Sequence, residues 1–401
     1  MSSQNDSTYT TNPKTCPRRQ AWERLPKWAW LQAFVTWVQG VPYPGQQPFF
    51  TSGPLSNALI HLMAPLLTAA LTGWLALYFP AAGWAEKLIM MALMLIGVLT
   101  TSGLLRAMSM YLEHYASHRA FGPYSSVIGE IAALLSQSIP LNLYEQDHLG
   151  PHHGHAASPE DPDQNWIESL GFRPGLPVSE YRAHLLRVLA PGRYFLRNLL
   201  ARIAGNLSPE QPRWRRAAFI SFQMAPLVIA ELSRGATSRS VAMLAVMIAW
   251  YLPLTYGAWI SRVLFALGLH VWFYRPDPRK SAYENMLGKT GARFFGDVVP
   301  AAELSGSARL FAWAIWWVRL ILIHMLIGKL FVMGDSDNMT HDAHHQDPAG
   351  RIHKFWIANY TRPQLIAARP RFRAWHTWGT VLTAIEHNFL YWSQAPRQEE
   401  E

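Results

Sequence analysis

The sequence predicts an all-α integral membrane protein in which two transmembrane helical hairpins supply four spanning helices, accompanied by interfacial helices and a cytosolic helical cap. The composition supports this class, because 50% of the residues are hydrophobic and only 15% are charged, whereas about a quarter of the residues of a soluble domain are charged. Several apolar runs also reach the ~20 residues that a helix needs to cross the hydrocarbon core. Eight of the 16 histidines form three tight clusters beside such runs, which predicts a histidine-rich site in the cap.

The N-terminal half of the chain predicts a tail followed by the first hairpin. Residues 1–50 begin as a polar, basic tail and continue as a Trp- and Pro-rich segment that we expect to lie on the membrane surface. The apolar runs 55–79 and 84–112 are each long enough to span. Because only residues 80–83 separate them, the two helices must turn back on each other as a hairpin.

The second expected hairpin joins residues 217–232 to residues 241–274 through a short polar connection. A further apolar run, 310–333, contains Arg319, His324 and Lys329. Three ionisable groups in one span are costly, so we expect this run to form an interfacial or re-entrant helix. The whole membrane domain then covers residues 51–376, and residues 377–401 form a C-terminal tail.

Charge predicts the orientation in the membrane. Residues 156–216 contain nine arginines, the strongest positive-inside signal in the chain. This places the histidine clusters on the cytoplasmic side of a multi-pass protein. We interpret the net charge of +9 as anchoring to anionic headgroups and not as nucleic-acid binding. The single cysteine excludes a disulfide framework and an iron–sulfur cluster, and the N-terminus shows no secretory signal peptide.

The three histidine clusters predict a site for two metal ions. Neutral imidazole is the commonest protein ligand for transition metals, and eight such ligands exceed what one ion can hold. The clusters comprise His114 and His118, then His148, His152 and His153, and finally His341, His344 and His345. His270 and His324 are both candidates for a ninth ligand. Nitrogen ligands suit iron, zinc, copper or nickel, and the spacing alone does not choose among these metals.

The spacings His114-x3-His118, His148-x3-His152-His153 and His341-x2-His344-His345 resemble the histidine boxes of the membrane fatty-acid desaturase and hydroxylase superfamily. Asn338, three residues before the last box, and the isolated His270 upstream of it also resemble that family. Many acyl desaturases have a two-residue gap in the second box. The three-residue gap here is closer to that of alkane hydroxylases.

This resemblance implies a membrane enzyme with two Fe ions that uses O2 and external electrons to oxidise an unactivated C–H bond of a lipid. It favours a fatty acyl desaturase whose substrate enters an apolar tunnel between the membrane helices. The electron donor would be a ferredoxin, a rubredoxin or cytochrome b5. The eight clustered histidines and His270 would be the iron ligands, with His324 as the alternative to His270. Nearby polar side chains would orient them: Glu113, Asp147, Asn338 and Asp342.

Several alternatives stay open. A hydroxylase or ketolase acting on an alkane, sterol or carotenoid has the same boxes, and a catalytically silent scaffold could keep the same fold. A histidine-rich metal transporter is a different class, but it needs ionisable residues along several spans. Residues 55–79 and 241–261 contain almost none. The arginines of residues 182–216 have a second interpretation, as a docking surface for an acidic electron donor.

Overall fold

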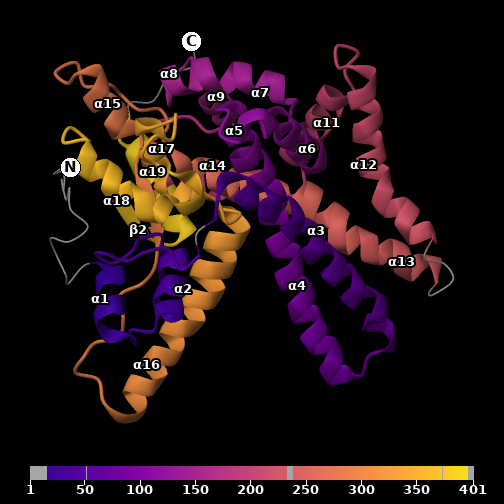
Figure 1. Cartoon of the computed structure of the whole chain (residues 1–401), viewed down its shortest axis with the longest axis horizontal. Helices are drawn as coiled ribbons and strands as arrows, with labels where there is room; N and C mark the ends of the chain where they lie inside the picture. The colour runs from indigo at the N-terminus through magenta and orange to yellow at the C-terminus, as the bar shows by residue number, and fades with distance from the viewer. Residues whose placement is uncertain (1–15, 51, 233–237, 373, 396–401) are drawn as a thin grey trace.

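The computed structural model describes residues 16–50, 52–232, 238–372 and 374–395, and the chain in these ranges is mostly helical. Four helices are long and apolar enough to cross a membrane: Pro54–Ala81, Trp84–Ser117, Arg239–Leu269 and Gly306–Val332. Helices α3 (Pro54–Tyr78) and α4 (Trp84–Ala107) extend together away from the shorter helices of the cap, and α16 (Gly306–Arg319) extends on the same side (Figure 1). The prediction of a helical chain with four such helices is confirmed.

Small side chains let α3 and α4 approach closely along the first hairpin. The hydroxyl oxygens of Thr68 and Thr101 lie 2.8 Å apart across the interface, and Gly97 faces Thr72. Small residues commonly bring helices together in membranes, where apolar surface alone gives little driving force between helices. The second helix then continues without a break through the π-helical turn η2 (Met108–Glu113) into α5 (His114–Ser117). It therefore carries the first histidine cluster at its C-terminal end.

One member of the expected set of four helices is different. The sequence analysis takes residues 217–232 as a span, but the helix α12 (Arg213–Leu232) is not among the four candidates of the structure. Charged residues at both of its ends, including Arg215 and Glu231, leave too short an apolar stretch. The fourth candidate is α16 together with η8 (Leu320–Val332), the run that was expected to be interfacial or re-entrant.

The ionisable groups of that helix have partners, which explains why they are tolerated. Asp297 accepts hydrogen bonds from Arg319 at 2.7 Å and lies 2.8 Å from Nε2 of His324. Lys329 donates to the carbonyl oxygen of Ser336 at 2.9 Å. Since a buried charge is costly mainly when it lacks a partner, these contacts reduce the penalty that the sequence argument assigned to the run.

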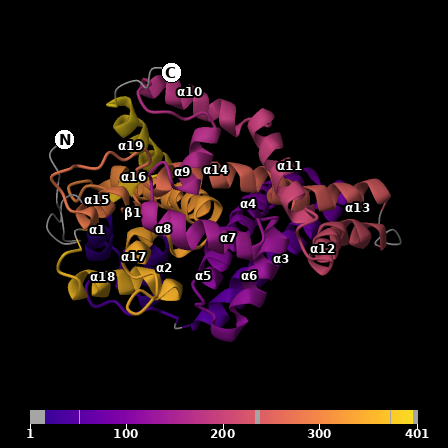
Figure 2. The same ribbon diagram turned by 90° about the horizontal axis from the view of Figure 1, so that it is seen from above.

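Three long helices end at one place beneath the cap. The helix Trp84–Ser117 ends at the first histidine cluster, α14 (Ala258–Leu269) ends next to His270, and η8 leads through η9 (Asp337–Thr340) into α17 (His341–Gln346). The second cluster lies on a helix pair, Gly122–Ser136 and Leu141–His155, that bends by 100°. Seen from above, α5, α8 (His153–His155) and α17 gather close together (Figure 2).

The remaining elements complete the cap and the connections. The helices are η1 (Phe79–Ala81), η3 (Gly122–Tyr124), α6 (Ser125–Ser136), α7 (Leu141–Asp147), η4 (His148–His152), α9 (Pro162–Ser169), α10 (Val178–Leu189), α11 (Arg193–Leu207), α13 (Arg239–Val246), η6 (Met247–Tyr251), η7 (Pro253–Gly257), α15 (Ala282–Lys289), η10 (Phe355–Ile357) and α18 (Ala358–Ala368). Strands β1 (Ala292–Phe295) and β2 (His376–Gly379) pair in parallel, with Ala292 opposite His376. This small sheet is a departure from the all-α expectation.

Both ends of the chain contain packed helices where the sequence analysis expects tails. At the N-terminal end lie α1 (Pro17–Arg24) and α2 (Ala29–Gln39), and the buried guanidinium of Arg18 donates to the side chains of Gln32 and Thr36. At the C-terminal end, α19 (Val381–Ser393) packs against α14 and buries Trp392 completely. Both segments are short and partly polar, but each contains apolar residues at helical spacing. These residues form the face through which the helices pack.

The close packing of α4 against η8 predicts the effect of a single methyl group. A Cβ at Gly103 would overlap the carbonyl oxygens of Leu330 and Phe331 and would lie 2.8 Å from the Phe331 Cα. Because backbone atoms cannot move aside, we expect Gly103→Ala to cost about 1–3 kcal/mol of stability and to lower the apparent melting temperature in detergent. The matched control is Gly205→Ala in α11, where no neighbouring atom lies within 4 Å. The control should leave the melting temperature unchanged or raise it, and equal losses in both variants would contradict the packing argument.

Candidate metal centre

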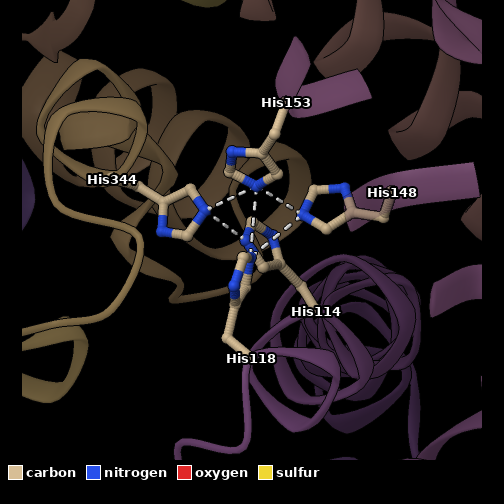
Figure 3. Close-up of side chains that lie close together, drawn as sticks. All are labelled: His114, His118, His148, His153 and His344. Atoms are coloured by element: carbon tan, nitrogen blue, oxygen red, sulfur yellow. Dashed lines mark hydrogen bonds between the residues drawn. The ribbon is translucent and has the colours of Figure 1, made fainter. Parts of the chain in front are cut away.

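Five imidazoles from all three histidine clusters point at one another (Figure 3). The Nε2 atoms of His114 and His344 are 2.8 Å apart, although 230 residues separate them in sequence. Nε2 of His153 lies 3.0 Å from that of His148 and 3.1 Å from that of His118. We call His114, His118, His148, His153 and His344 the first histidine group.

A second histidine group lies beside the first. It consists of His152, His270, His341 and His345, whose ligand nitrogens all lie within 4.8 Å of one another. Nε2 of His341 is 3.0 Å from that of His345 and 3.3 Å from that of His270. The rings of His153 and His345 have centroids 5.0 Å apart, so the two groups adjoin. All nine histidines that the sequence analysis selects as ligands are therefore in one place.

Burial keeps most of these imidazoles neutral. Burial lowers the pKa of His118 to about 4 and that of His153 to about 3, and the charge of neighbouring histidines adds to the effect. The same two causes hold the pKa values of His148, His341 and His344 well below the ordinary value. A neutral imidazole offers one nitrogen lone pair, which is the form that a metal ion binds.

The spacing of the nitrogens fits a bound metal ion. Two ligand nitrogens at about 2.1 Å from an ion and at right angles to each other are about 3.0 Å apart, and five pairs of Nε2 atoms in the first group are 2.8–3.3 Å apart. Neutral imidazoles that face one another this closely repel unless a proton or a cation lies between their lone pairs. These buried groups could therefore hold metal ions, and nitrogen ligands suit iron, zinc, copper or nickel.

An aspartate that the sequence analysis does not select fixes the orientation of His152. Oδ1 of Asp161 lies 3.0 Å from Nδ1 of His152, which leaves Nε2 for the second group. Burial lowers the pKa of His152, but the hydrogen bond to Asp161 and the charge of Asp163 outweigh burial and raise it. Asp161 also accepts a hydrogen bond from the backbone N–H of Asp163 and so caps α9. The sequence signal is the Asp-Pro pair that opens this helix shortly after the second cluster.

A second network reaches His344. The hydroxyl of Tyr115 lies 3.4 Å from Nδ1 of His344 and donates a short hydrogen bond to Asp337. Nε2 of His353 lies 3.3 Å from the same carboxylate. Sequence reasoning misses all three of these partners, although Tyr115 follows His114 directly and Asp337 lies just before the third cluster.

The side chains that were expected to orient the histidines do not contact them among the described residues. Glu113 is buried but forms no described hydrogen bond to a histidine, and Asp147 is exposed. Asp342 is buried in an ion pair with Arg362, which fixes helix α17 and not an imidazole. The side chain of Asn338 lies outside the described residues. Each of the three described acids follows or precedes a ligand in sequence, and on a helix such a neighbour points to a different side.

His324, the alternative ninth ligand, belongs to neither group. Its Nε2 pairs with Asp297, whereas His270 lies in the second group.

Comparison of the chain with protein-family models, with curated proteins and with solved structures finds no match. The argument for function therefore depends on the geometry of the site.

The contact between Asp161 and His152 predicts a selective loss of metal. Replacing Asp161 with Asn keeps the cap of α9 but removes the charge that holds His152, so metal affinity should fall about 10–100-fold. Competition of the purified variant with a chelator measures this affinity. The exposed Asp147→Asn is the matched control and should bind as the unmodified protein does; if it loses as much metal as Asp161→Asn, the assigned role of Asp161 is wrong.

The positions of the two further histidines predict opposite results. His270→Ala removes a member of the second group, so the ratio of metal to protein should fall. His324→Ala breaks the contact with Asp297 and should lower the melting temperature while leaving that ratio unchanged. Elemental analysis of both purified variants checks this, and a larger loss of metal in His324→Ala would reverse the assignment.

Proposed function

We propose that this chain is a membrane di-iron oxygenase that oxidises an unactivated C–H bond of a lipid. The first candidate within this class is a fatty acyl desaturase. The observation that carries the proposal is the convergence of nine imidazoles from four remote stretches of chain into two adjoining groups. A solvated histidine-rich loop or adventitious metal binding would not need buried nitrogens facing one another. The histidine spacings described above support iron as the metal.

The donor set fits two oxygen-activating iron ions. One group offers five nitrogen ligands and the other four. An iron ion with six coordination sites therefore keeps at least one site open in each group. Bound iron would supply the activation of O2 with electrons from outside the chain. The chain itself contributes neutral ligands, a fixed tautomer for His152 through Asp161, and the Tyr115–Asp337 pair behind His344.

A cavity of about 440 Å³ that reaches Asp337, the partner of Tyr115 behind His344, supports a lipid substrate. Tyr111 and Phe355 also line it, and the ring of Phe355 stacks on that of Tyr115 at 4.1 Å. Trp30, Phe49 and Phe50, which line it as well, are exposed.

The polar groups of this cavity already have partners inside the protein. Tyr111 donates to Asn57, Lys329 donates to the Ser336 carbonyl, and Trp37 donates to Asp335. A ligand therefore gains most from apolar contact. A larger apolar cavity of about 680 Å³ lies between α3, α6, α12 and α13. No histidine of the two groups lines either cavity, but the smaller one is lined by Asp337, the partner of Tyr115.

The arginines of residues 156–216 and the position of the site support a cytoplasmic location. The three long helices that lead into the site all end there with their C-termini. The site then lies at the ends of the candidate spans and not in their middle, which suits a multi-pass protein with its metal centre at the inner face.

A hydroxylase or ketolase of an alkane, sterol or carotenoid is the second candidate. The observation that favours it is the three-residue gap between His148 and His152. Both reactions begin by removal of hydrogen from a C–H bond, and they differ in whether oxygen remains in the product.

Expression in a host that lacks desaturases tests the proposal. We expect about two irons per purified chain and a new double bond in the cellular lipids; a new hydroxyl or keto group would favour the second candidate. His344→Ala should lose iron and abolish the product. The control His155→Ala changes an exposed histidine outside both groups and should retain both. Protein without iron, or substantial product from His344→Ala, would refute the proposal.

A further inference from the structure

A hydrogen bond connects a residue next to the second histidine group with a helix at the protein surface. Gln346 follows His345 directly and is buried. Its Oε1 accepts a hydrogen bond of 2.8 Å from the hydroxyl of Tyr283, and its Nε2 lies 3.3 Å from Sδ of Met286. Tyr283 and Met286 belong to α15, which lies at the end of the molecule opposite the tip of the α3–α4 hairpin (Figure 1).

Basic side chains surround Tyr283. It lines an open groove together with Arg369 and Arg371, and Lys280 precedes the groove residue Ser281. Tyr283 and Ile352, the residue after Arg351, pack against the same buried cluster. Lys280, Arg351 and Arg371 are exposed, and no described carboxylate forms an ion pair with them. We call Lys280, Tyr283, Arg351, Arg369 and Arg371 the Tyr283 surface.

The carboxylates near this surface are already engaged. Glu284 caps α15 by accepting from the backbone and hydroxyl of Ser281 at 2.8 and 2.7 Å. Asp277 pairs with Arg279. Asp347 is buried and lies 3.6 Å from the guanidinium of Arg369. The surface therefore presents an excess of positive charge above the second histidine group.

The arginines of residues 182–216 are used differently. Arg215 is buried in an ion pair with Glu130 at 2.8 Å, Arg182 pairs with Glu386, and Arg202 donates to the backbone of Gln137. The arginines that remain exposed there, on α10 and α11, alternate with exposed leucines such as Leu186 and Leu200. A mixed row of leucine and arginine suits a lipid surface better than a soluble acidic protein.

We propose that the Tyr283 surface is the docking site of an acidic one-electron carrier protein. This inference rests on the proposed function, which needs electrons from outside the chain. The docked carrier would lose one electron, and iron held by the second histidine group would gain it. Complementary charge steers such encounters and makes them sensitive to salt. The hydrogen bond from Tyr283 to Gln346, the residue after His345, brings this surface next to the second histidine group.

Binding of an acidic plant-type [2Fe–2S] ferredoxin to the detergent-purified full chain tests the docking site. The dissociation constant should rise steeply with ionic strength. The triple variant Lys280→Glu, Arg351→Glu, Arg371→Glu should bind about 10-fold or more weakly, because each change replaces an attraction by a repulsion. The matched control Arg187→Glu, Arg193→Glu, Arg197→Glu makes the same charge change on α10 and α11 and should shift the constant less than about twofold. Circular dichroism and metal content should be unchanged in both.

Each other outcome overturns the proposal. Unchanged binding by the first variant, or equal weakening by the control, places the ferredoxin elsewhere. If the first variant loses affinity for phosphatidylglycerol vesicles but not for ferredoxin, the surface faces lipid. A basic protein of similar size, cytochrome c, should not bind. Because binding is measured without turnover, a chain that lacks iron but binds ferredoxin at this surface refutes the proposed oxygenase and leaves the docking site standing.

Discussion

The close approach of nine imidazoles is the constraint on which the rest of the structure depends. Burial removes the water that would otherwise solvate their nitrogens, and it also keeps the rings uncharged. Lone pairs held about 3 Å apart repel, so the backbone must hold the rings in place until a cation binds between them. The structure does this with helix ends: three long helices stop at the same level, and each carries or leads into a part of the site.

Polar contacts around the site fix what the helices bring together. Asp161 holds His152, and the Tyr115–Asp337 pair lies behind His344. Asp342 pairs with Arg362 and holds α17 itself. The first two contacts orient imidazole rings, and the third positions a helix.

Much of this arrangement was predictable from sequence, and the failures have physical causes. Histidine clustering at the ends of apolar runs predicted eight of the nine members of the two groups, because long-range convergence follows when several helices end close together. The ninth, His270, is isolated in sequence and was predicted from its position upstream of the last cluster. Glu113, Asp147 and Asp342 were chosen as orienting side chains, but no described hydrogen bond joins them to a histidine, since proximity in sequence does not give direction on a helix. The run with Arg319, His324 and Lys329 was misjudged because its partners Asp297 and Ser336 are visible only in three dimensions. The helices at the two ends were not predicted, because each packs through a few apolar residues in a segment whose average composition is polar.

The C-terminal helix α19 has a consequence for biosynthesis. The amide of Asn388 donates to the carbonyl oxygens of Leu267 and His270, so α19 holds the backbone of a histidine made 118 residues earlier. While the helix that ends at His270 inserts, α19 has not yet been synthesised. The second histidine group is therefore complete only after α19 has left the ribosome and docked, so its assembly is a late step of folding.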